Sequence, residues 1–180
     1  YEEGQTVPVV CYTNAAKARL LVNGVQVGET KNYDDETGAI RWNVPYKPGI
    51  IKAEAMDENG KVVAEYSIKT SLRPYALKVT SDRTELGKAG SVAHVIVEVV
   101  DENGDFVNLA DNEIRCTVQG PAKLLGLEAS NNTDMTDYTL NVRRAYQGRL
   151  LAYIQGNGES GEITVSFSSP LLKGCSITLK

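Results

Sequence analysis

Apolar and polar residues alternate in many short runs along the chain, and turn residues such as Gly, Asn, Asp and Pro separate these runs. A period of two places successive side chains on opposite faces, which is typical of β-strands with one buried face. No segment keeps the 3.6-residue apolar period of an amphipathic helix. The sequence therefore predicts an all-β protein. The predicted strands are 7–12, 18–22, 25–30, 40–46, 51–56, 62–70, 75–80, 93–100, 113–119, 150–155, 163–168 and 176–179.

The spacing of these strands predicts two tandem immunoglobulin-like β-sandwiches. Short strands with turns at intervals of about 8–12 residues are typical of sandwiches. Pro74 donates no hydrogen bond to a sheet and biases Arg73 toward an extended backbone, so we expect the junction within 70–74. The predicted domains are 1–71 and 72–180.

Three short motifs are predicted to be turns. Asn23-Gly24 lies between two strand-like runs, and both residues tolerate the positive φ of a type I′ hairpin turn. Asp-Glu-Asn-Gly occurs at 57–60 and again at 101–104, each time after an alternating run. A calcium loop is the alternative for the second copy, because Asp101, Asn103 and Asp105 occupy alternate positions, but no later carboxylate completes the ligand set.

Residues 156–161 match the pattern G-x-G-x-x-G, which in a different context would indicate a dinucleotide site. That site requires a strand that leads into a helix, whose N-terminal amides face the pyrophosphate. Here the glycines connect two predicted strands, so we expect a hairpin loop and no cofactor.

Composition excludes several classes of function. The 180 residues are 42% hydrophobic and 23% charged, as in ordinary globular proteins. The net charge of −4 disfavours nucleic acid, which requires a basic face. No apolar run approaches the roughly 20 residues of a membrane span. The chain starts without Met, and we interpret it as a piece of a longer polypeptide, so a missing leader does not indicate location.

The three cysteines, Cys11, Cys116 and Cys175, are odd in number and lack metal-type spacing. We expect buried thiols on strands and no metal site.

No catalytic constellation emerges from the residues. His94 is the only histidine, and it lies in mid-strand among aliphatic residues with no nucleophile nearby. The acidic run 34–36 precedes Thr37-Gly38 in a loop, where solvated charge is the usual role of such residues. Paired carboxylates could hydrolyse a glycosidic bond only at a fixed spacing across a pocket, which a sequence does not reveal.

Aromatic side chains could stack on sugar rings, and the candidates for such contacts are Trp42, Tyr46 and Tyr33. Alternation places Ile40, Trp42 and Val44 on one strand face, so we expect Trp42 to be a core residue.

Several motifs resemble a known family. Tyr12-Thr13-Asn14, then Leu20-Leu21-Val22-Asn23-Gly24, then Val25 to Gly28 resemble the domain that follows the catalytic barrel in family 2 glycoside hydrolases of the β-galactosidase type. The resemblance continues through 38–49 and 52–55.

The second half resembles the final immunoglobulin-like domain of the same enzymes, and also adhesin-type immunoglobulin repeats of bacteria. The motifs are Thr84-Glu85-Leu86, 92–101, 120–126 and 144–152. The segment 128–133 departs from the family pattern, in which an Asn-Gly turn is followed by Pro. The same segment contains a formal glycosylation sequon at Asn131.

The resemblance implies a non-catalytic C-terminal region that packs on and stabilises a catalytic barrel of the same parent chain, and that could shape the cleft or a dimer contact. The catalytic glutamates of this family lie in the barrel, and no position here matches them. Two alternatives remain open, a carbohydrate-binding module and an adhesin-type immunoglobulin stalk. The resemblance also implies export to a bacterial periplasm or cell surface.

Overall fold

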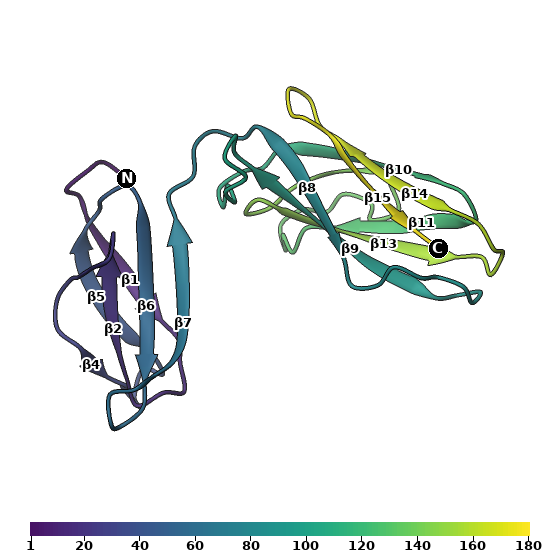
Figure 1. The fold of residues 1–180 in the computed structure, drawn as a ribbon. Helices are drawn as coiled ribbons and strands as arrows, with labels where there is room; N and C mark the ends of the chain where they lie inside the picture. Colours follow the sequence, from purple (N-terminus) through teal and green to yellow (C-terminus); the bar gives the residue numbers. More distant parts are fainter. The chain divides into compact units, whose positions relative to one another are not determined.

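In the computed structural model, which describes residues 1–180, the chain forms fifteen β-strands and no helix (Figure 1). The predicted all-β sandwich fold is confirmed. The chain divides into two compact units, Tyr1–Thr70 and Ser71–Lys180. The domain boundary predicted from the sequence, between residues 71 and 72, lies one residue after the boundary between these units. No helix of the length and apolarity needed to cross a bilayer is present.

The first unit contains a two-stranded sheet, β1-β5, and a second sheet in the order β3-β2-β6-β7, with β4 also pairing with β2. All the pairs are antiparallel. The strands are β1 (Thr6–Cys11), β2 (Lys17–Val22), β3 (Val25–Gln26), β4 (Lys31–Asn32), β5 (Ile40–Pro45), β6 (Ile50–Met56) and β7 (Val62–Lys69).

Alternate residues of these strands form the core of the first unit, and the buried set includes Leu20 on β2 and Ile40, Trp42 and Val44 on β5. On β5 the residues between them, Arg41 and Asn43, are exposed. The alternation in the sequence therefore identified the buried face of β5 correctly.

The Asn23-Gly24 hairpin is confirmed, since φ is 51° at Asn23 and 81° at Gly24. The Asn23 carboxamide also bridges to the next turn: it donates to the Pro48 carbonyl over 3.0 Å and accepts from the Ile50 amide over 2.8 Å. A Cβ atom at Gly49 would lie 1.9 Å from the Asn23 side-chain oxygen, so this contact requires glycine there.

The second unit is a sandwich of two four-stranded sheets, β11-β13-β9-β8 and β12-β10-β14-β15. Its strands are β8 (Ala76–Ser81), β9 (Val92–Val100), β10 (Glu113–Gln119), β11 (Ala122–Glu128), β12 (Val142–Arg144), β13 (Arg149–Gly156), β14 (Ile163–Ser168) and β15 (Cys175–Leu179). The core lies between the sheets and includes Val95 and Val97 of β9, Leu150 of β13 and Phe167 of β14.

The three cysteines are free thiols on strands, as expected, but only Cys116 is fully buried, and Cys11 and Cys175 are partly buried. Burial raises the pKa of Cys116 to about 12 and that of Cys175 to about 11, and it also raises the pKa of Cys11. Desolvation is the cause in each case, because the low-polarity surroundings disfavour the thiolate.

Both Asp-Glu-Asn-Gly segments are turns, and they share two kinds of hydrogen bond. The Asp57 carboxylate accepts from the Lys61 amide over 2.9 Å, and the Asp101 carboxylate accepts from the Asp105 amide over 3.0 Å. The glycine amide of each turn donates to the carbonyl of its aspartate over 3.0 Å. The Asp101 carboxylate thus has a structural role in closing its turn.

Residues 156–161 connect β13 to β14, so the glycine pattern lies between two strands, as predicted, and leads into no helix. The predicted hairpin was wrong, because β13 and β14 belong to different sheets and the loop crosses from one sheet to the other.

Some predicted elements were wrong or missing. The run 25–30 is a strand only over Val25–Gln26, because Gly28 turns the chain at a φ of 68° and the Glu29 carbonyl accepts a hydrogen bond from the Trp42 indole. The strands β4, β11 and β12 were not predicted. β11 shifts register between Leu124 and Gly126, and this irregularity breaks the alternation that a sequence pattern detects.

Candidate functional site

The three predicted carbohydrate-contact residues differ in accessibility. Trp42 is 3% exposed, and its indole nitrogen donates to the Glu29 carbonyl over 3.1 Å, so neither ring face is open to a sugar. Tyr46 and Tyr33 are half-buried. The Tyr46 ring lies 5.8 Å from the ring of Tyr1. A sugar-binding role of Tyr46 and Tyr33 stays a prediction.

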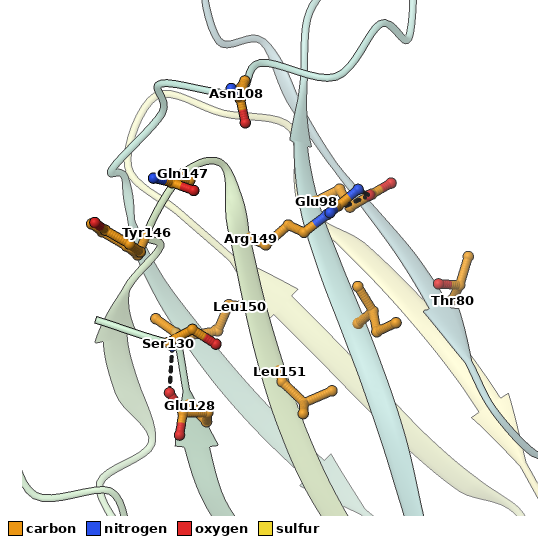
Figure 2. A pocket seen from close by; sticks show the side chains of 12 residues that line it. Thr80, Glu98, Asn108, Glu128, Ser130, Tyr146, Gln147, Arg149, Leu150 and Leu151 are labelled. Carbon is orange, nitrogen blue, oxygen red and sulfur yellow. Dashed lines mark hydrogen bonds and ion pairs between the residues drawn. The ribbon is translucent and has the colours of Figure 1, made fainter. Parts of the chain in front are cut away.

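A shallow depression of about 670 Å³ lies on the second unit, on the side of the β11-β13-β9-β8 sheet that faces away from the core (Figure 2). Its floor is apolar: Ile96 of β9 and Leu151 of β13 are directly opposite each other in the ladder, and Thr80 of β8 is opposite Ile96 on the other side. The other lining residues are Glu98, Asn108, Glu128, Ala129, Ser130, Tyr146, Gln147, Arg149 and Leu150.

An ion pair lies at one end of this floor. Arg149 and Glu98 are cross-strand neighbours, and the Arg149 guanidinium contacts one oxygen of Glu98 through Nε at 3.0 Å and Nη2 at 2.9 Å. The guanidinium also lies 4.5 Å from the centre of the Phe106 ring. These contacts hold Arg149 in place, although its side chain is 60% exposed.

A tight turn forms the rim beside this pair. Gln147 and Gly148 have φ values of 49° and 76°. A Cβ atom at Gly148 would lie 2.4 Å from the Val107 carbonyl oxygen, so only glycine fits. The turn presents Gln147 and the 40% exposed ring of Tyr146 next to the depression. Residues 144–149 were noted only for their resemblance, and the predicted strand 150–155 gave no sign of a surface site.

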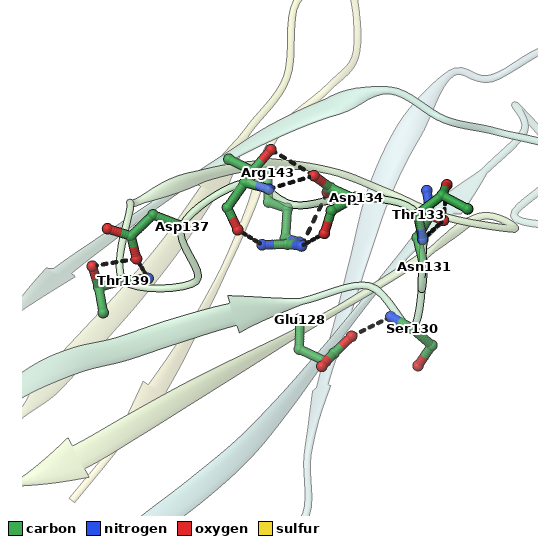
Figure 3. A network of polar contacts seen from close by, with 9 residues as sticks. Glu128, Ser130, Asn131, Thr133, Asp134, Asp137, Thr139 and Arg143 are labelled. Carbon is green, nitrogen blue, oxygen red and sulfur yellow. Dashed lines mark hydrogen bonds and ion pairs between the residues drawn. The ribbon is translucent and has the colours of Figure 1, made fainter.

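A buried arginine organises the long loop between β11 and β12 (Figure 3). The Arg143 side chain is 2% exposed and pairs with the Asp134 carboxylate at 3.0 Å. It also donates to the backbone carbonyls of Thr136 over 3.1 Å and Asp134 over 3.3 Å, and lies 4.4 Å from the centre of the Tyr138 ring. The loop folds around this one cation.

The same loop contains three consecutive triplets in which Asn or Asp is followed two residues later by Thr. In each triplet, the Thr amide and the Thr hydroxyl both donate to one side-chain oxygen of the Asn or Asp. The triplets are Asn131-Asn132-Thr133, Asp134-Met135-Thr136 and Asp137-Tyr138-Thr139. This loop includes most of the segment that departs from the family pattern, and local side-chain bonds replace the Asn-Gly turn expected there.

These bonds lower the pKa of two carboxyl groups. The Thr136 hydroxyl and then its amide lower the pKa of Asp134, and the charge of Arg143 adds to the effect. The Thr139 amide and hydroxyl lower the pKa of Asp137. Donors that point at an oxygen favour its ionised form.

His94 is part of a surface pair on the same sheet. Its Nδ1 lies 2.9 Å from the Asp82 carboxylate, whose other oxygen accepts from the His94 amide over 2.8 Å. Burial would raise the pKa of Asp82, but the hydrogen bonds from His94 outweigh it and the net shift is downward. The nearby Ser81 hydroxyl donates to the Arg83 carbonyl over 2.7 Å rather than to the imidazole. These residues form no nucleophile, base and acid triad.

The acidic run 34–36 lies in a loop, as expected. The Asp34 carboxylate accepts from the Thr37 hydroxyl over 2.6 Å and from the Glu36 amide over 3.0 Å. These hydrogen bonds, the Thr37 hydroxyl first, lower the pKa of Asp34. The run therefore closes a turn. No group of three or more His, Cys, Asp or Glu side chains is arranged to hold a metal ion.

Two β-sandwich modules of this type are found in known proteins. Residues 77–178 match the family described as glycoside hydrolase family 2 C-terminal domain 5, and residues 4–64 match a domain of unknown function, DUF4982. The chain therefore belongs to the C-terminal domains of glycoside hydrolase family 2.

Among the curated relatives, the chain is similar to beta-galactosidase BoGH2A of Bacteroides ovatus, with 36% identity over 94% of this chain and 20% of that protein. It is also similar to a beta-glucuronidase of Formosa agariphila, with 30% identity over 100% of this chain and 18% of that protein. The chain thus spans about a fifth of the length of these relatives.

Solved structures of family 2 enzymes are also similar to this chain and also extend well beyond it. A beta-glycosidase from Bacteroides vulgatus superimposes with a TM-score of 0.90 and 33% identity over 99% of this chain and 23% of that chain. A family 2 member from Bacteroides cellulosilyticus gives a TM-score of 0.87 with 26% identity.

Proposed function

We propose that this chain is a non-catalytic accessory region of a family 2 glycoside hydrolase, and that it packs on and stabilises the catalytic barrel of its parent. A contribution to the rim of the active-site cleft or to a dimer contact is a further part of this hypothesis. The proposed parent reaction is hydrolysis of a β-galactoside or β-glucuronide, the substrate classes named in the relatives.

The main support is the extent of the match. The match to the Bacteroides vulgatus beta-glycosidase covers 99% of this chain at a TM-score of 0.90, yet it covers only 23% of that protein. The charged groups Glu98, Asp82 and Asp34 are already engaged in ion pairs or turns, which favours a structural role. Fold alone does not specify activity, so the hypothesis needs a direct test.

The test compares three proteins: the parent, the parent without these 180 residues, and the 180 residues alone. Each is assayed on a chromogenic β-galactoside and a chromogenic β-glucuronide after heating over a range of temperatures. We expect turnover by the parent, none by the isolated 180 residues, and inactivation of the truncated parent at lower temperature. Hydrolysis by the isolated chain, or equal heat resistance of the truncated parent, would contradict the proposal.

A second candidate function is carbohydrate binding, and the depression on the second unit favours it. It combines an apolar floor at Ile96 and Leu151 with an exposed ring at Tyr146 and hydrogen-bonding groups at Gln147 and Arg149. Affinity electrophoresis on plant and bacterial polysaccharides tests this candidate. Retardation that is lost in Tyr146→Ala and retained in Tyr12→Ala, an exposed tyrosine of the first unit, would support it. No retardation on any polysaccharide would contradict it.

Export to a bacterial periplasm or cell surface is likewise proposed, and the resemblance to family 2 enzymes is its support. Fractionation of the source cells, with an antibody against this chain, tests it. Recovery in the cytoplasmic fraction would contradict it.

A further inference from the structure

The edge strand β7 has an unusual environment for a strand in a sandwich. It pairs only with β6, so its other edge is free (Figure 1). All eight of its residues, Val62–Lys69, are exposed. The exposed fractions of its large apolar side chains are high, at 73% for Tyr66 and 55% for Ile68.

The sequence of β7 nevertheless has the pattern of a strand with one buried face. Ala64, Tyr66 and Ile68 lie on one face, and Glu65 and Ser67 lie on the other. Isolated exposed apolar residues are common, but three in succession on one strand face form a contiguous apolar strip. Such a strip indicates a surface that another part of a protein covers.

This strip continues the core face of the same sheet. The register places Leu20 of β2, Ala53 of β6 and Tyr66 of β7 side by side, so their side chains point to the same face. Their burial decreases across the sheet: Leu20 is 1% exposed, Ala53 is half-buried, and Tyr66 is 73% exposed.

The opposing sheet explains this decrease. It has only two strands, β1 and β5, against the longer path β3-β2-β6-β7. On β1, Val7 is buried, but Val9 and Cys11 are only partly buried, although they belong to the same core. The first unit is therefore a sandwich whose core face is incompletely covered.

The other face of the sheet is polar and carries a network of ion pairs. There the Glu54 carboxylate contacts Arg19 at 2.7 Å and Lys52 at 2.8 Å, and Lys52 also contacts Glu65 at 3.3 Å. Glu54 has a lowered pKa, caused by the hydrogen bonds from Lys52 and then from Arg19. Only the apolar face of β7 therefore lacks a cover.

We propose that the apolar strip of β7, formed by Ala64, Tyr66 and Ile68, is the docking surface for the polypeptide that precedes residue 1 in the parent. This inference rests on the proposed function. The curated relatives contain about four-fifths of their length outside the part that matches this chain. In the proposed parent, that polypeptide is joined covalently to residue 1, so its local concentration beside the strip is high.

We place the cover against the face of β7 and not at the free edge of β1. β1 contains Pro8, a residue that offers no amide to a neighbouring strand and is confined to sheet edges or bulges. The preceding polypeptide therefore contributes an apolar surface that packs against the side chains of Tyr66 and Ile68.

The test uses the full-length parent and the 180-residue chain, each with Tyr66→Asp or Ser67→Asp. The two positions are adjacent on β7 and point to opposite faces. We expect both variants to leave the melting temperature of the 180-residue chain unchanged, since both side chains are exposed there. In the parent, Tyr66→Asp should lower the melting temperature by several degrees and Ser67→Asp should not. Hydroxyl-radical labelling of Tyr66 should be severalfold slower in the parent than in the 180-residue chain.

Equal labelling of Tyr66 in the two proteins, or equal effects of the two variants on the parent, would overturn the inference. Labelling of the 180-residue chain that slows as its concentration rises would also overturn it, because a second copy would then be the occupant. The truncated parent separates this result from the proposed function. If the truncation lowers heat resistance while Tyr66→Asp does not, the accessory role stands and only the docking surface is wrong.

Discussion

At the residue scale, Arg143 is the clearest case of a charge that organises structure. Its guanidinium is buried, yet it has a carboxylate, two carbonyls and an aromatic ring around it. A buried ion pair gives little net stability compared with an apolar replacement, but removal of one partner leaves the other without compensation. The intact pair with Asp134 therefore contributes little net free energy, whereas loss of Arg143 alone is costly.

We expect Arg143→Ala to lower the unfolding free energy of the 180-residue chain by about 2–4 kcal/mol, because the carbonyls and carboxylate lose their donor. Urea unfolding measures this change. Arg144→Ala is the matched control: its side chain is 62% exposed and pairs with Asp111 on the surface, so a loss below about 1 kcal/mol is expected. Similar losses in the two variants would mean that the buried contacts of Arg143 do not stabilise the loop.

Asp137 allows a test of the triplet bonds through pH. Its pKa is lower in the folded chain than the ordinary 3.8, because the Thr139 amide and hydroxyl donate to it. A group with a lowered folded pKa stabilises the fold above its unfolded pKa, and this contribution is lost as the pH falls through the folded pKa. The loss of stability between pH 5 and the acid limit should therefore be smaller in Asp137→Asn, which keeps the turn but does not titrate.

Urea midpoints at a series of pH values below 5 measure this difference. Thr139→Val should reduce the same pH dependence by removing the hydroxyl donor. An unchanged pH dependence in both variants would show that the Asp137 bonds do not persist in solution.

At the element scale, alternation decides which side of a strand is buried, and β13 shows this over two adjacent residues. Leu150 is 1% exposed and belongs to the core, whereas Leu151 is half-buried on the floor of the depression. We expect Leu150→Ala to cost about 3 kcal/mol of unfolding free energy and Leu151→Ala less than about 1 kcal/mol. Urea unfolding of both variants measures the contrast, and equal losses would reverse the assignment of the two faces.

The sequence predicted most strands because they alternate regularly, and it predicted the Asn23-Gly24 turn because both residues adopt a positive φ. It missed β12, which has only three residues, and β11, whose register shifts at Gly126. Too few residues, or a break in the period, leaves no pattern to detect.

The ion pairs and the loop contacts could not be predicted from the sequence. Arg149 and Glu98 are 51 residues apart in the sequence, so only the tertiary register brings them together. Arg143 was not predicted to be buried, because a charged residue in a short strand gives no apolar signal. The departure of residues 128–133 from the family pattern was visible, but the three Asn or Asp and Thr triplets that replace the expected turn were recognised only from the structure.

At the scale of the whole molecule, the two units differ in the size of their cores. The main cluster of buried apolar residues has six members in the first unit, Tyr1–Thr70, and twenty in the second, Ser71–Lys180. Small domains bury a smaller fraction of their surface on folding and are less stable as a result. The uncovered strip on β7 adds to this difference.

We therefore expect the 180-residue chain to unfold in two transitions on heating, with the first unit melting at the lower temperature. Trp42 is the only tryptophan and lies in the first unit, so its fluorescence reports that unit alone. Circular dichroism of the strands reports both units. A tryptophan transition that coincides with the whole circular dichroism transition would contradict this prediction and indicate a single cooperative fold.

The free cysteines have a practical consequence for all of these measurements. Burial raises the pKa of Cys116 to about 12 and that of Cys175 to about 11, so both thiols are overwhelmingly protonated and unreactive at neutral pH. The upward shift at Cys11 acts in the same direction. A cysteine introduced at Ser67 on the water-facing side of β7 would ionise far more readily. Spectroscopic probes can therefore be attached there selectively, with the three native thiols left in place.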